Sequence, residues 1–507
     1  MIAGLSGRSG KTVITLGLLR LLSRRGLVVQ PFKKGPDFVD PGWHRVASGR
    51  VSRNLDSFLM TPEQILGVYA EATRDSDLSI IEGAMGLFDG MDLEGSTSSA
   101  QIAKITQTPV ILVVETTRMT RTTAALVMGL MHFDPELRIA GVILNRVRSQ
   151  RHEKLIRDSI ESTCGLPVLG AIPVDSRLDI PDRHLGLLSS EEAAEREQIV
   201  DAIADVIAEH VDIGALLTLA GEHCSVNSES GVGAESITHT PLPMPCSELS
   251  AAELAASQLR QSSLPKALHK SSAPEISILS VSASASESKL RGSGLSPAPR
   301  IAVLRDAAFC FYYEENLEAL RQQGAELVFI DSLVDTSLPE DIHALHIGGG
   351  FPEVFAAQLE ANKELRSQLR EIIEADLPVY AEGGGLMYLG RRLEFQGDSF
   401  EMVGALPLDT VMQQQRQSHG YLVVEATDAS LWLEAGSILK GHAFHHFLVT
   451  NLDPSFSLTF KTTLGLGIID KFDGLFYRNV LATSLHVNAL ASPLWAEKLV
   501  ERARLYQ

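Results

Sequence analysis

Gly4-Leu-Ser-Gly-Arg-Ser-Gly-Lys-Thr12 lies between a very short apolar strand and an amphipathic helix, and this order of elements decides the fold of the first half. Such a loop turns backbone N–H groups and a helix N-terminus toward phosphates. Ser9 and Gly10 belong to the loop, Lys11 can reach terminal phosphates and Thr12 can coordinate Mg²⁺. Five residues, one more than in the common P-loop, separate Gly4 from Gly10. The alternative is an ordinary Gly/Ser turn, but the flanking strand and helix favour a phosphate site.

Outward from this loop, strands and helices alternate to about residue 220. Short apolar runs rich in β-branched residues predict parallel strands at 78–82, 110–114, 139–144 and 168–172. Helical periodicity predicts crossover helices at 11–24, 122–131, 152–162 and 191–209. We therefore predict a doubly wound α/β domain over residues 1–220.

A change of composition divides the chain. Residues 221–298 are dominated by Ser, Ala, Pro and Glu, cannot bury enough apolar area to offset the ordering entropy, and are expected to form a disordered linker. From residue 299 onward strands are predicted at 300–304, 327–330, 343–347 and 379–382, with helices at 314–323 and 355–374. Antiparallel strands are predicted at 421–425 and 441–449. The expected fold is α/β, with two doubly wound, mostly parallel-sheet domains over residues 1–220 and 299–507.

The bulk composition excludes several classes of protein. The 507 residues are 45% apolar and 21% charged, enough for large cores, and their net charge of −19 disfavours nucleic acid and anionic membranes as partners. Four scattered cysteines form neither a disulfide framework nor a zinc motif. No apolar run is long enough to span a membrane, and no signal peptide precedes the first strand. We expect a cytoplasmic protein.

Acidic residues follow the loop in two places. Lys33-Lys-Gly-Pro-Asp37-Phe-Val-Asp40 combines two cations with two carboxylates, and by itself is equally consistent with a solvated surface turn. The predicted strand 78–82 ends in Glu82-Gly-Ala-Met-Gly-Leu-Phe-Asp89-Gly90. Open α/β sheets bind ligands at the carboxyl ends of their strands, so Glu82 is a candidate for holding Mg²⁺ against ATP phosphates. A strand-end cap is the alternative role for Glu82.

These motifs resemble the synthetase domain of cobyrinate a,c-diamide synthases, which are relatives of dethiobiotin synthetase. Two further segments carry the resemblance: Ser-Arg-Asn-Leu-Asp at 52–56 and Ile-Pro-Asp-Arg-His-Leu-Gly at 180–186. The resemblance implies that ATP phosphorylates peripheral carboxylates of a tetrapyrrole and that ammonia then displaces the phosphate. It implies catalytic roles for Asp37, Asp40, Glu82 and Asp89, and Mg²⁺ ligation by Thr12, Asp37 and Glu82. ATP binding is assigned to Ser9, Gly10, Lys11, Thr12, Lys34 and Asn145, and substrate binding to Lys33, His44 and Arg53. Asn145 would read adenine, although Asn after a strand is also a common turn former.

The second half resembles the amidotransferase domain of the same family. The matching segments are 300–313, His346-Ile-Gly-Gly-Gly-Phe-Pro-Glu353, Val379-Tyr-Ala-Glu-Gly-Gly-Gly-Leu-Met387, Gly441-His-Ala-Phe-His445 and Leu481-Ala-Thr-Ser-Leu-His486. In relatives a cysteine directly after the strand that matches 379–382 forms a glutamyl thioester, and glycines matching Gly349 and Gly350 help to form the oxyanion hole. This chain has Gly383 at the cysteine position.

Without that thiol, glutamine hydrolysis is not expected from the remaining residues. His486 keeps the position of the base, Asn488 stands where relatives usually carry a second histidine, and Cys310 is expected to pack as a small apolar residue. The nitrogen would come from glutamine as in the family, from free ammonia, or from a separate glutaminase.

Two alternatives concern the function of the molecule as a whole. Sirohaem or nickel sirohydrochlorin carries the same acetate groups as cobyrinate and is an alternative substrate; the Lys33-Lys34 pair mildly favours sirohaem. A non-catalytic, nucleotide-dependent binding protein is the alternative from another class. The resemblance also implies a homodimer.

Overall fold

Seven parallel strands form the sheet that carries the phosphate loop, in the order β3-β2-β4-β1-β5-β6-β7. The computed structural model describes residues 1–183, 186–193, 195–226, 297–430, 432–454 and 456–507. We call residues 1–226 the amino-terminal lobe and 297–507 the carboxy-terminal lobe. The seven strands are β1 (Ile2–Gly4), β2 (Val29–Lys34), β3 (Arg53–Leu55), β4 (Leu78–Glu82), β5 (Val110–Glu115), β6 (Ile139–Val147) and β7 (Val168–Pro173).

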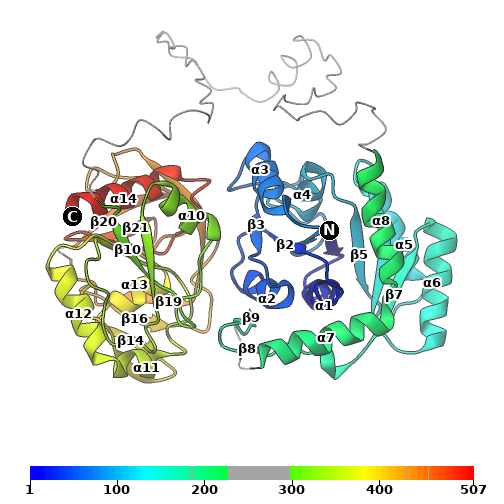
Figure 1. Cartoon of the computed structure of the whole chain (residues 1–507), viewed down its shortest axis with the longest axis horizontal. Coiled ribbons are helices and arrows are strands. Elements are labelled where there is room, and N and C mark those ends of the chain that lie inside the picture. Colours follow the sequence, from blue (N-terminus) through cyan, green and yellow to red (C-terminus); the bar gives the residue numbers. More distant parts are fainter. Residues whose placement is uncertain (184–185, 194, 227–296, 431, 455) are drawn as a thin grey trace, which may run out of the picture. The chain divides into compact units, whose positions relative to one another are not determined.

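Helices cover both faces of this sheet because its side chains alternate between two cores. Ile81 and Leu112 join the core under α3, α4, α5 and α6, whereas Ile80 and Ile111 join the core under α1, α2, α7 and α8. The helices are α1 (Lys11–Arg24), α2 (Val39–Ser48), α3 (Pro62–Thr73), α4 (Ser99–Ile105), α5 (Thr122–Phe133), α6 (Gln150–Cys164), α7 (Arg196–His210) and α8 (Ile213–Val226). Figure 1 shows α1 between the sheet and α7. A 3-10 turn (Ser176–Leu178) and the hairpin β8 (Asp182–Arg183) and β9 (Gly186–Leu187) precede α7.

The carboxy-terminal lobe is built on a mixed sheet of ten strands in the order β11-β10-β12-β13-β22-β21-β20-β17-β18-β23. In this order, the first five strands (β11, β10, β12, β13 and β22) are parallel to one another, and every later pair of neighbours is antiparallel. Their bounds are β10 (Arg300–Leu304), β11 (Glu326–Ile330), β12 (Ala344–Ile347), β13 (Val379–Glu382), β17 (Ser418–Ala426), β18 (Ile438–His445), β20 (Ser457–Leu464), β21 (Phe472–Tyr477), β22 (Val480–Thr483) and β23 (His486–Val487). The antiparallel part is larger than the two pieces predicted from the sequence.

A four-stranded sheet and five helices complete this lobe. The small sheet holds β14 (Arg392–Phe395), β15 (Asp398–Glu401), β16 (Asp409–Met412) and β19 (Phe447–Thr450). The helices are α10 (Glu314–Gln322), α11 (Ala356–Ala361), α12 (Lys363–Glu374), α13 (Gly384–Leu389) and α14 (Pro493–Tyr506). The single helix predicted over 355–374 is two helices, because Asn362 leaves helical angles and its side chain accepts a hydrogen bond from the N–H of Leu365.

The predicted α/β class is confirmed in both lobes. By their contacts, Met1–Cys224 and Ala298–Gln507 form one compact unit. Most of the segment predicted as a disordered linker, 221–298, lies outside the described residues. Among the helices that are described, none is both long and apolar enough to cross a lipid bilayer.

Candidate active site

The phosphate loop connects the end of β1 to the first turn of α1. Gly10 adopts a left-handed conformation with φ 96°, which glycine tolerates without strain. The ammonium group of Lys11 donates hydrogen bonds of 2.8 Å to the carbonyl oxygens of Ser6 and Met85. Burial, assisted by the nearby charge of Lys33, lowers the pKa of Lys11 to about 8. The loop therefore folds around its own lysine where the sequence predicts a phosphate group.

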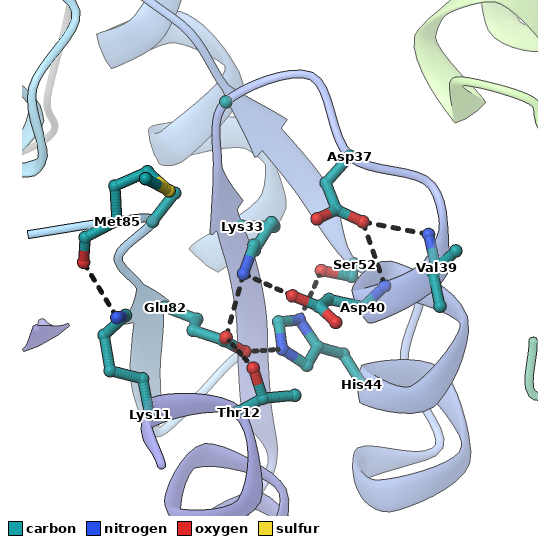
Figure 2. Close-up of polar contacts among 12 residues, drawn as sticks. Lys11, Thr12, Lys33, Asp37, Val39, Asp40, His44, Ser52, Glu82 and Met85 are labelled. Atoms are coloured by element: carbon teal, nitrogen blue, oxygen red, sulfur yellow. Dashed lines mark hydrogen bonds and ion pairs between the residues drawn. The ribbon is translucent and has the colours of Figure 1, made fainter. Parts of the chain in front are cut away.

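Glu82 is the centre of a buried polar network at the carboxyl end of β4 (Figure 2). One of its oxygens, Oε1, accepts hydrogen bonds from Thr12 Oγ1 at 2.6 Å and from Lys33 Nζ at 2.8 Å. The other oxygen lies 2.7 Å from His44 Nε2, and the second ring nitrogen of His44 lies 3.0 Å from Ser52 Oγ. Because β4 lies between β1 and β2 in the sheet, residues from three sequence motifs meet at one carboxylate.

Lys33 also forms an ion pair with Asp40 in this network. Burial would raise the pKa of Glu82, but Lys33 and His44 outweigh it and hold the pKa well below its ordinary value. Burial, joined by repulsion from Asp37, raises the pKa of Asp40. One buried cation, Lys33, thus faces the two buried carboxylates of Glu82 and Asp40. Of the two, Asp40 keeps its proton to a higher pH than an ordinary aspartic acid does.

Asp37 fixes the start of α2. Its Oδ1 accepts hydrogen bonds from the backbone N–H of Val39 at 2.9 Å and of Asp40 at 3.1 Å. Asp89 does the same for the next loop, accepting a 2.7 Å hydrogen bond from the N–H of Gly86. Each carboxylate therefore has a structural partner and still reaches the large cavity described below.

The residues present fit a magnesium ion that is shared with phosphate oxygens. Thr12 Oγ1 and Glu82 Oε1 are adjacent hard oxygen ligands, and Mg²⁺ is usually held by one or two such ligands with substrate phosphates and water. Within the described residues, no group of three or more His, Cys, Asp or Glu forms a metal site made by protein alone. The phosphates would have to complete the coordination.

A cavity of about 880 Å³ opens beside these carboxylates. From the amino-terminal lobe it is lined by the predicted residues Lys34, Asp37, Asp40 and Asp89, and from the carboxy-terminal lobe by His486 together with residues such as Tyr421 and His442. This volume lies in the range typical of ligand pockets, about 300–1,000 Å³. One cavity therefore brings together predicted residues that are far apart in the sequence.

Several predicted residues do not line that cavity. Lys33 and His44 are buried in the Glu82 network, and Arg53 forms ion pairs with Glu318 and Glu315 of the carboxy-terminal lobe. The amide nitrogen of Asn145 donates a 2.9 Å hydrogen bond to the carbonyl oxygen of Ser9 in the phosphate loop. Substrate binding by the first three residues and adenine binding by Asn145 stay predictions.

The turn that carries a cysteine in glutamine-using relatives is formed here by Gly383, between β13 and α13. Its φ of 45° is strained for any other residue, and a Cβ atom built on it would lie 2.9 Å from Cε1 and 3.1 Å from Nε2 of His486. The other ring nitrogen of His486 lies 3.3 Å from Glu382 Oε2. The base and its carboxylate partner therefore still surround a position that has no nucleophile.

The neighbouring predicted residues have clear packing roles. A Cβ on Gly349 would lie 2.2 Å from the His486 ring, and one on Gly350 would lie 2.1 Å from the carbonyl oxygen of Ala308, so neither position has room for a side chain. Asn488 accepts hydrogen bonds from the N–H groups of Leu490 and Ala491 and shapes the turn before α14. An oxyanion role for the two glycines stays a prediction.

Sequence reasoning missed three residues of these sites. Glu382 could have been predicted from the sequence, because it directly precedes Gly383 at the end of a strand, as Glu82 precedes Gly83 in the other lobe. His442 lies within a quoted motif, and its Nδ1 lies 3.1 Å from the hydroxyl oxygen of Tyr313. Tyr421 gave no signal, since its partner Asp56 is 365 positions away and their 2.7 Å hydrogen bond exists only in the fold.

Comparison with known proteins gives matches over both lobes. Residues 1–188 match the family described as the CobQ/CobB/MinD/ParA nucleotide binding domain, and residues 300–494 match the CobB/CobQ-like glutamine amidotransferase domain. The chain is 38% identical over 504 residues to a cobyrinate a,c-diamide synthase of Archaeoglobus fulgidus, covering 99% of this chain and 97% of the relative. It is 38% identical over 488 residues to the synthase of the same name from Magnetococcus marinus, covering 96% and 93%. A hydrogenobyrinate a,c-diamide synthase of Streptomyces coelicolor is 37% identical over 513 residues, covering 99% and 97%.

Proposed function

The chain belongs to the family of cobyrinate a,c-diamide synthases, and we propose that it uses ATP to amidate the a- and c-acetate carboxylates of a cobyrinate-type tetrapyrrole in cobalamin biosynthesis. The nucleotide-binding and amidotransferase matches support a carbon–nitrogen ligase. The observation that carries the proposal is the 880 Å³ cavity, whose wall holds Asp37, Asp40 and Asp89 and has room for a large ring. Met85 of the same wall accepts a hydrogen bond from Lys11 of the phosphate loop.

The chemistry explains why a phosphate site must adjoin a carboxylate site. A carboxylate is a poor acyl donor because its leaving group would be oxide. Transfer of the γ-phosphoryl group of ATP to an acetate oxygen releases ADP and forms an acyl phosphate. Ammonia then attacks the carbonyl carbon, a C–N bond forms, the C–O bond to phosphate breaks, and the nitrogen loses a proton to solvent. The products are an amide and phosphate.

We assign the residues according to where negative charge accumulates. Lys11 and the N–H groups before α1 would hold the terminal phosphates, while Ser9 and Gly10 complete the nucleotide site. Mg²⁺, which Thr12, Glu82 and Asp37 would hold, neutralises phosphate charge when it is bound. Asp40 and Asp89 would position the acetate, and Lys33 and His44 hold Glu82 in place. A homodimer, a cytoplasmic location and a separate glutaminase partner stay predictions.

The test measures ADP release and product mass with Mg-ATP, ammonium chloride and each of cobyrinate, sirohaem and nickel sirohydrochlorin. We expect ADP release that depends on a carboxylated ring, with the fastest amide formation on the cobyrinate type. Lys11→Ala should lower kcat/KM on the order of a hundredfold, because a phosphate charge loses its partner. ATP turnover that is the same with and without every ring would refute the ligase and favour a nucleotide-dependent binding protein. Faster amidation of sirohaem would correct the substrate.

A further inference from the structure

Among the described residues, Lys34 is the only lysine or arginine that lines the large cavity. The same wall holds four aspartates: Asp37, Asp40, Asp89 and Asp92. Burial lowers the pKa of two histidines on the wall, His419 and His442, so both are neutral near pH 7 and add no positive charge. A ring that carries several carboxylates therefore meets a mostly acidic wall, in which Lys34 is the permanent cation.

The ammonium group of Lys34 is buried but has no partner. The residue is 8% exposed, and within the described part of the chain it forms neither a hydrogen bond nor an ion pair. Burial lowers the pKa of Lys34, and attraction by Asp56 opposes this effect. A buried charge without a partner is costly, and a carboxylate would offset that cost. The nitrogen is not sealed off by protein atoms, in contrast to Nε2 of His445, so a ligand in the cavity can reach it.

The two carboxylates whose charges act on Lys34 are held by other groups. Both oxygens of Asp56 accept hydrogen bonds, one from two backbone N–H groups and the other from the Tyr421 hydroxyl group at 2.7 Å. Asp89 accepts a hydrogen bond from the N–H of Gly86. Neither carboxylate forms an ion pair with Lys34 in the described structure, so the lysine stays available to an anionic ligand.

Lys33 and Lys34 end β2 on opposite faces of the sheet, because successive side chains of a strand alternate. Lys33 contacts Glu82, which also accepts a hydrogen bond from Thr12 of α1. Phe32, two residues before Lys34, packs in the core on the other face, under α3, α4, α5 and α6. Lys34 therefore belongs to the face that lies away from α1, although its sequence motif groups it with the nucleotide.

The remaining wall of the cavity suits the flat face of a conjugated ring. Five phenylalanines line it: Phe38, Phe88, Phe311, Phe351 and Phe444. Two of them, Phe38 and Phe311, are stacked with centroids 5.0 Å apart. Aromatic side chains offer broad apolar surfaces that can bury the face of a macrocycle. The peripheral carboxylates of that macrocycle need a cation instead, and Lys34 supplies one.

We propose that Lys34 binds a peripheral carboxylate of the tetrapyrrole, one that is not being phosphorylated, and that this ion pair orients the ring in the cavity. The reacting acetate must lie near Lys11 and Thr12, on the opposite face of β2, so a different carboxylate of the same ring reaches Lys34. The inference rests on the proposed amidation and adds a specificity-determining contact to it.

The first experiment measures binding of the ring without turnover, from its visible absorbance, in the full-length chain without ATP. Lys34→Met should raise the dissociation constant of cobyrinate about tenfold or more, because a charge-assisted hydrogen bond is lost. Cobyrinate with every carboxylate methylated to an ester should bind the wild type and Lys34→Met equally. Lys154→Met is the matched control: this lysine of α6 has a side chain that is 76% exposed, and its loss should change neither dissociation constant.

The second experiment measures amide formation with Mg-ATP, ammonium chloride and cobyrinate. Lys34→Met should raise the KM for the ring about tenfold or more and leave the KM for ATP unchanged, because only the contact with the ring is removed. Lys34→Arg keeps the charge and should recover most of the affinity for the ring. Lys34→Gln serves for both experiments if the Met variant does not fold.

Three results would overturn the proposal. The first is an unchanged affinity for cobyrinate in Lys34→Met, and the second is equal weakening for cobyrinate and its ester, because the contact is then not ionic. The third is a raised KM for ATP with an unchanged KM for the ring, which would return Lys34 to the nucleotide site. Weaker binding of cobyrinate by Lys34→Met, together with no amide product from the wild type, leaves the carboxylate contact standing and refutes the proposed amidation instead.

Discussion

Lys33 illustrates how a single buried charge can decide the stability of a site. It is 4% exposed and contacts both Asp40 and Glu82, so Lys33→Met would leave two buried carboxylates without their cation. Removing one member of a buried ion pair typically costs about 3–5 kcal/mol, and we expect a loss of that order in the free energy of unfolding. Urea titrations at pH 7.5 measure it.

The control variants separate this effect from the loss of a lysine as such. Lys34→Met changes the next residue, for which no ion pair is recorded in the described structure, and should cost much less. The double variant Lys33→Met/Asp40→Asn should recover part of the stability, because only one carboxylate then remains charged. Equal losses for Lys33→Met and Lys34→Met would contradict the assigned network.

His445 gives a prediction for the dependence of stability on pH. Its pKa is about 4 in the folded protein, below the ordinary value of 6.5, so its contribution is complete above pH 6.5 and is lost as the pH falls to 4. With about 1.4 kcal/mol for each pKa unit, wild type should lose on the order of 3 kcal/mol relative to His445→Gln over this range. Urea midpoints at pH 7 and pH 4 check it; parallel curves for the two proteins would exclude a neutral, buried His445.

At the scale of elements, the turn from β13 into α13 depends on a glycine. Gly383→Ala should be destabilised because φ is 45° and the new Cβ would press against the His486 ring at 2.9 Å. Gly397→Ala is the matched control: its φ is also positive, at 93°, but a Cβ there meets nothing within 4 Å. We expect about 1–2 kcal/mol from backbone strain in each variant and a further loss only at Gly383. Adding His486→Ala to Gly383→Ala should relieve that further loss. The melting temperatures of the three variants measure it, and no recovery in the double variant would contradict the contact with His486.

The central elements could be predicted from the sequence because their signals are local. The strands at 78–82, 300–304 and 379–382 match β4, β10 and β13 residue for residue, since their apolar runs end at charged residues or glycines. The break between α11 and α12 was missed: the periodicity continues across Asn362, and only the cap of that side chain on Leu365 reveals a new helix. The strands β14 to β16 of the small sheet have short, partly exposed patterns that give no comparable signal.

The candidate site was predictable to the extent that each motif stands at the end of a strand. Lys11, Thr12 and Glu82 belong to motifs with known physical roles, and strand order then brings them together. Two contacts could not be predicted from the sequence: the hydrogen bond of Tyr421 and the ion pair of Arg53 with Glu318. Nothing in the local sequence indicates which distant residue will lie opposite.

At the scale of the whole molecule, contacts between the lobes should govern cooperative unfolding. Arg53→Met removes the cation beside Glu315, which is 5% exposed and whose pKa burial raises to about 7 despite Arg53. We expect its thermal transition to broaden or split, because one buried carboxyl loses its partner in the other lobe. Arg50→Met is the control, since the Asp75 partner of Arg50 is 72% exposed and such pairs contribute little. Identical melting curves for the two variants would contradict a stabilising contact at Arg53.

The network around Glu82 has a consequence for how ligands are recognised. Thr12, Lys33 and His44 already hold this carboxylate, and Asp37 already fixes the first turn of α2, before any substrate arrives. Most of the configurational entropy of these side chains is therefore lost during folding, and the encounter with nucleotide requires little further rearrangement. The protein is preorganised at Glu82, so these side chains do not have to be ordered again when a ligand arrives.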